Sequence, residues 1–483
     1  MKIKKQSMGT NYIFHSLYQM LTLLTPLITT PYISRVLLAD GVGAYSYTYT
    51  IVQYFIMFGN FGFSTYGQIE IAKCRNNEKK RSNTFWELFF LRTGVFTISL
   101  IAYICFAFCS TEYQTLYFVL IGYLLASYID ISWYYFGQDD FKSVSIRNIF
   151  VKIISIIGIF IFVKIKADLW KYVLILSASN LIGSIVMWPG IKSSLTFPVM
   201  KELHFRRHIR PTIEYFIPNI ATSIYTMIDK TMIGFFSDGA SQNGYYEQAH
   251  KIEQMMVQFL LSISVVGRSR MANYFAEKRY EDARKTIDSS MRMIFFLSIP
   301  MCVGLIVVAE DLTLWFLGTD FAECVILLRI FALLLIIISL SNCASNMYLL
   351  PNGKQNKFTI GVYTGACINI VCNLFLIPRY GALGATIASV FSEFIILIVF
   401  FCFSKEYYGM RKYTKEIFRY SFASGIMVVV IMLLDLLIYN SNMIRLFTKI
   451  GLGAITYFII LLMLNDEMIM NVIIRIKHKV YKK

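Results

Sequence analysis

An acidic and a basic residue stand next to each other in an otherwise apolar stretch of the chain. The stretch is SIYTMIDKTMIGFF, Ser223 to Phe236, and the pair is Asp229 and Lys230. A charge near the centre of a lipid bilayer costs about 2.5–3.5 kcal/mol on insertion scales. Neighbouring residues on a helix point about 100° apart, so these two side chains do not face each other. Each therefore needs a partner on another helix, or water.

The helix predicted to follow this stretch supplies charges of both signs at the same depth. They are Glu247, Lys251 and Glu253, with His250 and Gln254 beside them. The charges alone leave two interpretations open. One is an ion-pair network that joins two helices, and the other is a hydrated cavity that binds a charged ligand.

A few tyrosines are candidates for contacts with sugar rings. The chain has 32 tyrosines, and most are expected in the aromatic belts at the two membrane surfaces. Tyr45 and Tyr49 lie four residues apart, which places them on one face of a helix. Tyr246 has a matching depth in the second half of the chain. We expect these three to be the tyrosines that stack on a sugar.

The sequence contains no motif of a known catalytic site. There is no phosphate-binding loop for ATP and no G-x-S-x-G nucleophile turn. The nine cysteines lie mostly inside apolar runs, where cysteine behaves as a small hydrophobic residue. No histidine stands near Cys105 and Cys109, so a metal site is not expected. We predict a protein that is not an enzyme and has no cofactor.

The elements that must position these residues are membrane-spanning helices. The 483 residues are 57% hydrophobic, which is too apolar for a soluble protein of this size. Long apolar runs alternate with short charged clusters, as in polytopic helical membrane proteins. We predict an all-α fold with about fourteen spans, at 10–36, 42–69, 84–109, 114–136, 144–164, 169–189, 211–236, 246–274, 287–309, 323–350, 357–378, 381–403, 416–439 and 446–464.

The basic residues predict the orientation of these spans. The formal charge is +17, and lysine and arginine concentrate in every second connection between spans. Because cytoplasmic connections collect lysine and arginine, this alternation places both termini in the cytoplasm. The basic residues do not form a separate basic domain, so we expect no nucleic-acid partner.

Two pairs of similar segments suggest an internal repeat. GAYSYTYTI (Gly43 to Ile51) resembles GYYEQAHKI (Gly244 to Ile252), and FGQDDFKS resembles PNGKQNKFT. We predict two related six-helix lobes, 1–200 and 201–405, and an appended helix pair with a basic tail, 406–483. Such repeats build transporters around a central cavity. The segment KELHFRRHIRP, which includes the basic residues 201–210, is predicted to lie on anionic headgroups.

Several motifs in chain order resemble one family of membrane transporters. They are TTPYISRVLLADGVGAYSYT, FGFSTYGQIEIAKCRN, HIRPTIEYFIPNIATSIYTMIDKTMIG followed by GYYEQAHKI, LLPNGKQNKF, and NLFLIPRYGALGATIASVFSE. Together they resemble the Wzx-type polysaccharide repeat-unit flippases of the multidrug/oligosaccharidyl-lipid/polysaccharide exporter superfamily. The resemblance covers nearly the whole chain.

The resemblance implies a multi-pass protein of the bacterial plasma membrane with a cationic cavity between two lobes. Its substrate would be an undecaprenyl-pyrophosphate-linked oligosaccharide, moved to the outer leaflet for capsule or O-antigen assembly. Polysaccharide polymerase and glycosyltransferases are the protein partners to expect. The family's cavity-lining helices correspond here to Arg35, Tyr45, Asp229, Lys230, Tyr246 and Lys251. The depth of Asp229 and Glu253 makes them candidates for coupling H⁺ or Na⁺ to transport.

Three alternatives remain open. A drug/cation antiporter of the same superfamily would share the fold but favour an acidic cavity. A lipid II flippase would use the same mechanism on a different headgroup. A polytopic polysaccharide polymerase needs a sizeable outer loop with catalytic residues, whereas the outer connections here are short.

Overall fold

The chain folds into long helices, as predicted. The computed structural model describes residues 8–191, 194–198, 200–237, 239–407, 409–435 and 442–470. Within these ranges the regular structure is helical and contains no strand. Eleven helices of the described part are long and apolar enough to cross a membrane. The chain is therefore an all-α polytopic membrane protein.

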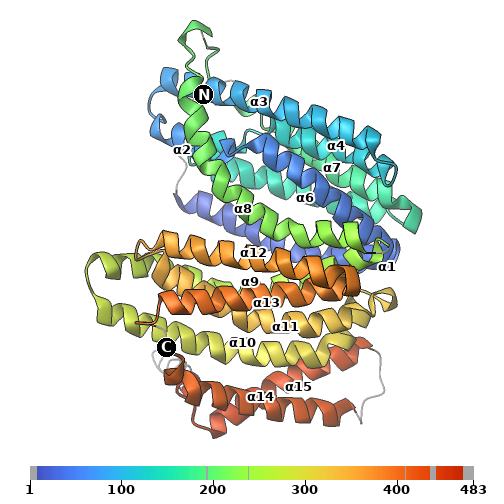
Figure 1. The fold of residues 1–483 in the computed structure, drawn as a ribbon, viewed down its shortest axis with the longest axis vertical. Coiled ribbons are helices and arrows are strands. Elements are labelled where there is room, and N and C mark those ends of the chain that lie inside the picture. The colour runs from blue at the N-terminus through green and yellow to red at the C-terminus, as the bar shows by residue number, and fades with distance from the viewer. Residues whose placement is uncertain are drawn as a thin grey trace. The chain divides into compact units, whose positions relative to one another are not determined.

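Contacts divide the chain into two compact units, which are described separately. Unit 1 is Met1–Gly244 and unit 2 is Tyr245–Lys483. In unit 1 the main helices are α1 (Met8–Asn60), α2 (Phe63–Lys73), α3 (Glu78–Cys109), α4 (Gln114–Ile129), α5 (Ser132–Gly137), α6 (Phe141–Phe162), α7 (Leu169–Val186) and α8 (Arg206–Phe236), shown in blue to green in Figure 1. Short 3₁₀ turns lie at Lys166–Asp168, Pro189–Ile191 and Met200–Glu202.

The first two predicted spans form one 53-residue helix, α1, with a kink. At Leu38 the backbone has a φ of 57° and a ψ of −179°, which is not helical. The second span then ends early, because Phe61 and Gly62 both adopt positive φ and separate α1 from α2. Glycine enters this backbone region without the steric cost of a Cβ atom. The predicted span 42–69 therefore includes a break between two helices, α1 and α2.

The span predicted at 114–136 is also broken, into α4 and α5. Arg92 of α3 is 1% exposed and donates to the backbone carbonyls of Ser127 and Asp130 at the end of α4. It also donates to the Asn60 side-chain oxygen, 3.0 Å away. The last carbonyls of a helix have no partner within the helix. A buried arginine satisfies them here, which allows the chain to turn inside the bundle.

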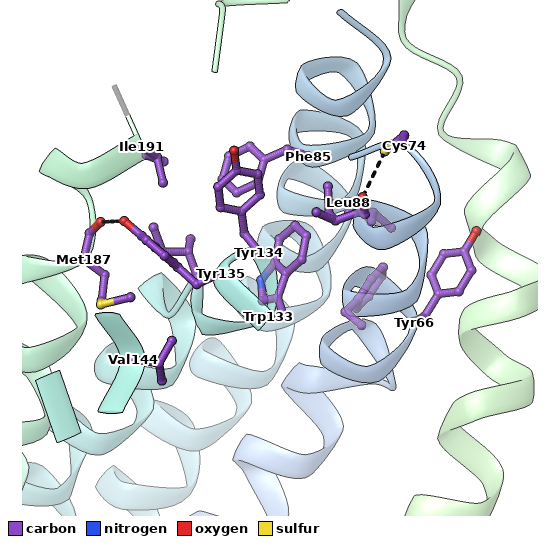
Figure 2. Packing of buried hydrophobic residues seen from close by; sticks show 13 residues of the cluster. Tyr66, Cys74, Phe85, Leu88, Trp133, Tyr134, Tyr135, Val144, Met187 and Ile191 are labelled. Carbon is purple, nitrogen blue, oxygen red and sulfur yellow. Dashed lines mark hydrogen bonds between the residues drawn. The ribbon is translucent and has the colours of Figure 1, made fainter. Parts of the chain in front are cut away.

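An aromatic core fixes the end of unit 1 at which α2, α3 and α5 meet (Figure 2). Phe85 of α3 stacks on Trp133 of α5, with ring centroids 5.3 Å apart. Tyr135 donates its hydroxyl to the Met187 carbonyl at 2.7 Å, which joins α5 to the segment after α7. Large rings bury much apolar area with few rotatable bonds. This core therefore provides a rigid support for the polar residues on α2 and α3.

Unit 2 contains the remaining helices, shown in yellow to red in Figure 1. They are α9 (Ser241–Ala276, which begins at the last residues of unit 1), α10 (Tyr280–Phe316), α11 (Cys324–Ala344), α12 (Gln355–Tyr380), α13 (Ala382–Phe403), α14 (Thr414–Asp435) and α15 (Asn442–Met463). A π-helical turn, Ser345–Leu349, extends α11. Short 3₁₀ turns lie at Thr319–Phe321 and Met410–Tyr413.

Ion pairs hold α14 and α15 against α10 near both ends. Near one end, Lys449 is 2% exposed and contacts both Asp311 of α10 and Asp435 of α14. Near the other end, Arg292 of α10 pairs with Glu416 at 3.3 Å. The described residue Glu467, just after α15, pairs with Arg292 at 2.7 Å. The appended helix pair is thus fixed to α10 by charges as well as by packing.

The predicted span limits agree with the helices except at the breaks and ends given above. One candidate span, Ile13–Lys73, covers 61 residues, overlaps most of the first predicted span and includes the second. The helices α8 and α9 have 31 and 36 residues but are not among the eleven apolar candidates in the described part. The total of fourteen spans, the cytoplasmic termini and the division into lobes at 200 and 405 stay predictions.

Candidate functional site

Asp229 and Lys230 lie in the second half of α8. Asp229 is 7% exposed, and Lys230 is half-buried. The backbone carbonyl of Lys230 accepts a hydrogen bond from the Asn243 side chain at 2.9 Å. The next residue, Thr231, shares a hydrogen bond of 3.0 Å with the Tyr54 hydroxyl of α1. The charged pair thus lies where α8 packs beside the second half of α1.

Two glycines allow the backbones to approach closely beside this pair. A Cβ atom at Gly43 would lie 2.6 Å from the Ala240 carbonyl carbon, in the turn between α8 and α9. A Cβ atom at Gly244 would lie 2.9 Å from the Ala39 carbonyl carbon, in the kinked part of α1. These are the first residues of the two similar segments of the sequence analysis. Gly43 therefore packs against the backbone just before Gly244, and Gly244 packs against the backbone just before Gly43. This reciprocal contact lies within unit 1.

The remaining candidates of unit 1 lie on α1. Arg35 is exposed, and its guanidinium contacts the Pro31 carbonyl at 3.4 Å. Tyr45 and Tyr49 stack on each other with centroids 5.4 Å apart, as their spacing predicts. Their other ring contacts are with tyrosines of α4 and α7: Tyr45 with Tyr172, and Tyr49 with Tyr123. Both rings pack into a tyrosine cluster inside unit 1.

In unit 2, Tyr246 is part of the helix packing. It is 2% exposed, and its hydroxyl lies 3.2 Å from the Ser389 hydroxyl of α13. Its ring stacks on the imidazole of His250 at 5.7 Å and contacts Phe331 of α11. Sugar stacking by Tyr246 stays a prediction, and it requires a conformation that exposes the ring.

The charges of α9 form two local pairs. Lys251 pairs with Glu247 at 3.1 Å, and its side chain is 33% exposed. Glu253 is 1% exposed, and one of its oxygens lies 3.1 Å from His250 Nδ1. The other imidazole nitrogen lies 2.9 Å from the amide nitrogen of Gln254. Within the described residues, neither His250 Nδ1 nor the two Glu253 carboxylate oxygens have a hydrogen-bond partner.

The predicted residues are divided between the two units. Asp229, Lys230, Arg35, Tyr45 and Tyr49 belong to unit 1, whereas Tyr246, Lys251 and Glu253 belong to unit 2. A common substrate site for all of them stays a prediction.

Sequence reasoning missed Tyr54. It lies on α1 beside α8, and the signal for it was Tyr47, seven residues earlier and hence on the same helix face. A Cβ at Gly234 of α8 would meet the Tyr47 ring.

A second polar cluster lies at the start of α8, outside the predicted sites. Glu87 of α3 is 1% exposed and accepts from His208 Nε2 at 2.7 Å and from the guanidinium of Arg207 at 2.5 Å. The backbone N–H of His204 donates to the other Glu87 oxygen at 2.7 Å. Tyr66 of α2 is hydrogen-bonded to His208 Nδ1 at 2.8 Å. The predicted surface segment 201–210 is therefore partly folded onto α3, and α8 begins inside it at Arg206.

Comparisons with known proteins establish the family. Residues 8–267, more than half of the chain, match the family described as polysaccharide biosynthesis protein. The chain belongs to this family. Residues 215–378 also match the family described as MatE, which covers the middle of the chain.

Two similar curated proteins share the description "Putative O-antigen transporter". The chain is 24% identical over 411 residues to the protein described as "Putative O-antigen transporter" of Escherichia coli (strain K12), with 84% of this chain and 99% of that protein aligned. A protein of the same description from Shigella dysenteriae is 22% identical, with 81% of this chain and 95% of that protein aligned.

Solved structures confirm the fold. The lipid II flippase MurJ in an inward closed conformation superposes with a TM-score of 0.69 at 17% identity, over 95% of this chain and all of that one. An inward-facing multidrug resistance MATE transporter superposes with a TM-score of 0.63 at 13% identity, over 82% of this chain and 97% of that one. The chain thus has the fold of the superfamily that its sequence motifs indicate.

Proposed function

We propose that this family member is a flippase for undecaprenyl-pyrophosphate-linked oligosaccharide repeat units. It moves them from the cytoplasmic to the outer leaflet of the bacterial plasma membrane by alternating access, for capsule or O-antigen assembly. The observation on which the proposal rests is the end-to-end alignment with O-antigen transporters, which covers 99% of the Escherichia coli relative. The match to the polysaccharide biosynthesis family supports it.

The charged residues suit a pyrophosphate headgroup. A pyrophosphate bears several negative charges and does not cross hydrocarbon unaided. Basic side chains give it charge-assisted hydrogen bonds, which are about twice as strong as neutral ones. Arg35 is exposed, Lys230 is half-buried and Lys251 is 33% exposed, so none of these three cations is fully buried in the structure. We assign headgroup binding to them, while the polyprenyl tail stays in lipid.

The test is a transport assay with purified protein in liposomes. Lipid-linked repeat units start on one leaflet, and an impermeant glycosidase detects those that reach the other. We expect transport by the unaltered chain and a large loss in Lys230→Gln and Lys251→Gln. Lys73→Gln is the matched control, because Lys73 is an exposed lysine outside these helices. Normal exposure of repeat units in cells that lack the chain would contradict the proposal.

The same assay separates the alternatives. If the chain transported lipid II in place of the repeat unit, it would be a lipid II flippase, like its structural neighbour. If it exported cationic drugs, it would be a drug/cation antiporter. We propose that the chain performs no chemical step. If repeat units were found joined into longer glycans by the purified chain alone, it would be a polymerase.

We further propose that Glu253, with Asp229 as the second candidate, couples H⁺ or Na⁺ to transport. Glu253 is buried beside His250, so a change of its charge alters the balance of charges within α9. The double variant Asp229→Asn with Glu253→Gln tests the coupling. Transport should lose its dependence on the ion gradient. Unchanged rate and unchanged ion dependence would end the coupling proposal but leave the flippase proposal intact.

A further inference from the structure

We propose that unit 1 binds an anionic phospholipid on the outer face of α3, at a site separate from the substrate path. The headgroup occupies a basic pocket at the start of α3, and an acyl chain lies along aromatic rings further down the same helix face. This inference does not depend on the proposed flippase activity.

The pocket is a cavity of about 310 Å³ between the first turns of α3 and the segment before α8. Lys79, Lys80, Asn83 and Arg207 contribute cationic or N–H-donating groups to its walls. Lys80 and Arg207 also line a neighbouring cavity of about 280 Å³. Cavities of a few hundred cubic ångströms hold small-molecule groups. The two cavities adjoin along Lys80 and Arg207 and offer room for a phosphate and its glycerol.

The pocket already holds one anionic group of the chain itself. The Glu202 carboxylate pairs with Lys79 at 2.8 Å and accepts from the Asn83 amide at 3.3 Å. These hydrogen bonds lower the pKa of Glu202, with Lys79 as the largest contribution. Lysine and asparagine side chains at the start of α3 are therefore arranged to bind oxygen anions.

The acids in the walls of the two cavities do not cancel their positive charge, and Glu70 of the second cavity is paired with Lys73. Glu87 is neutralised by Arg207 and hydrogen-bonded by His208, and Glu202 is neutralised by Lys79. Among the residues that the structure describes, Lys80 is exposed and makes no ion pair. Its ammonium remains for an external anion. Basic residues near a membrane surface each add about 1 kcal/mol to the binding of anionic lipid.

An aromatic stack continues from the pocket along α3. Lys79, Asn83, Trp86 and Phe90 are spaced by four, three and four residues, which places them on one helix face. Trp86 stacks on Phe90 at 5.5 Å and on Phe197 at 5.1 Å. Phe197 is 88% exposed and Phe90 is 38% exposed. The exposed edge of this stack is apolar, as an acyl chain requires.

The exposed position of Phe197 is held by the fold. The adjacent Thr196 accepts from the Trp86 indole at 3.1 Å and donates its backbone N–H to the Ser82 hydroxyl at 3.1 Å. Arg81 donates to the Ser194 carbonyl at 2.7 Å. A phenylalanine fixed outward would be unfavourable in water but is favourable at a membrane surface, where aromatic rings contact the upper acyl chains. This feature points to a lipid rather than to a soluble phosphate.

The test is native mass spectrometry of the purified full chain in detergent, titrated with phosphatidylglycerol. We expect Lys80→Gln to weaken binding about fivefold, from the loss of one basic residue. Lys285→Gln, an exposed lysine of unit 2, is the matched control and should leave binding unchanged. Glu202→Gln should strengthen binding, because it removes the internal competitor. A merely structural role for Glu202 does not predict that gain.

Three outcomes would overturn the proposal. One is an equal loss in Lys80→Gln and Lys285→Gln, which would mean non-specific attraction. Another is equal binding of zwitterionic phosphatidylcholine. The last combines two results: inorganic phosphate displaces the lipid at a concentration equal to that of the lipid, and Phe197→Ser binds the lipid as well as the unaltered chain does. Together these results would mean a site for soluble phosphate.

Discussion

At the residue scale, charges were easier to find in the sequence than their partners. Asp229, Lys230, Lys251 and Glu253 stand out because a charge within an apolar helix is costly and needs a reason. The sequence indicated their partners only where the partner is a few residues away on the same helix, as Glu247 is for Lys251. The Tyr54–Thr231 hydrogen bond joins residues 177 positions apart, and no sequence spacing indicates such a pair.

The tyrosines show the same limit. The spacing of Tyr45 and Tyr49 correctly predicts that they share a helix face. Spacing does not tell which neighbour that face contacts, and here it contacts Tyr123 and Tyr172 inside unit 1. The face of α1 beside α8 is instead that of Tyr54.

A pH dependence of stability is expected from His208, which precedes the predicted span 211–236. Burial lowers the pKa of His208 below its ordinary value of 6.5, against the opposing effect of Glu87. Tyr66, Glu70 and Arg207 are the other titratable or charged groups that face it. A lowered pKa means that the unfolded chain binds the proton more tightly. The stabilisation is thus complete above pH 6.5 and is lost as the pH falls through the folded-state pKa.

The measurement is thermal unfolding of the detergent-purified chain between about pH 7.5 and about pH 5.5. The unaltered protein should lose stability towards the acidic end of this range. His208→Gln should have a lower but flatter stability profile, since glutamine does not titrate. A slope in His208→Gln as steep as in the unaltered chain would assign the effect to other groups.

At the element scale, helix breaks were harder to predict than helices. Apolar runs locate the spans, but the ends of α1 and α4 depend on Gly62 and on the buried Arg92. Arg92 lies within the predicted span 84–109, and its guanidinium satisfies carbonyls of a helix about 35 residues away along the chain. Such long-range capping has no local signature.

The attachment of α14 and α15 to α10 yields a second prediction. Lys449→Met would remove the buried ammonium next to Asp311, which is 4% exposed, and leave Asp311 with Arg445 at 3.4 Å. Breaking a buried ion pair costs about 3–5 kcal/mol when the remaining charge has no other partner, so the loss here should not exceed this range. Chemical unfolding in detergent should show this loss.

The control for that variant is Lys73→Met. Lys73 pairs with Glu70 at 2.7 Å, but its side chain is 66% exposed. Exposed pairs contribute no more than about 1 kcal/mol. Losses of equal size in the two variants would show that the cluster around Lys449 is not a buried structural pair. The double variant Lys449→Met with Asp311→Asn should recover part of the loss, because it removes a buried charge for which Arg445 is the remaining partner.

At the scale of the whole molecule, the all-helical class was predictable because composition alone exceeds what a soluble protein tolerates. Family membership was predictable because several motifs occur in order along the chain. The boundary between the contact-defined units lies after Gly244, so α8 belongs to unit 1, whereas the predicted boundary between the lobes, at residue 200, stays a prediction. Similarity between the two sequence halves reflects their origin, whereas the contacts that define the units reflect one conformation of the chain.

The orientation of the molecule is the third prediction. The distribution of lysine and arginine places both termini and the start of α3 in the cytoplasm. A fluorescent protein fused after Lys483 should be bright, because it folds in the cytoplasm, and a cysteine-specific impermeant reagent should label a cysteine placed at Lys166 from outside. Labelling at position 80 from outside would reverse the topology.

The reciprocal contact of Gly43 and Gly244 limits how this sequence can vary. No side chain fits at either position while the α1 kink and the α8–α9 turn remain in place. Gly94, Gly425 and Gly451 have open space where a Cβ atom would lie and carry no such limit. A mutagenised library of this chain can be selected for transport of new glycans. We expect the selected variants to carry substitutions at Gly94, Gly425 and Gly451, and almost none at Gly43 and Gly244.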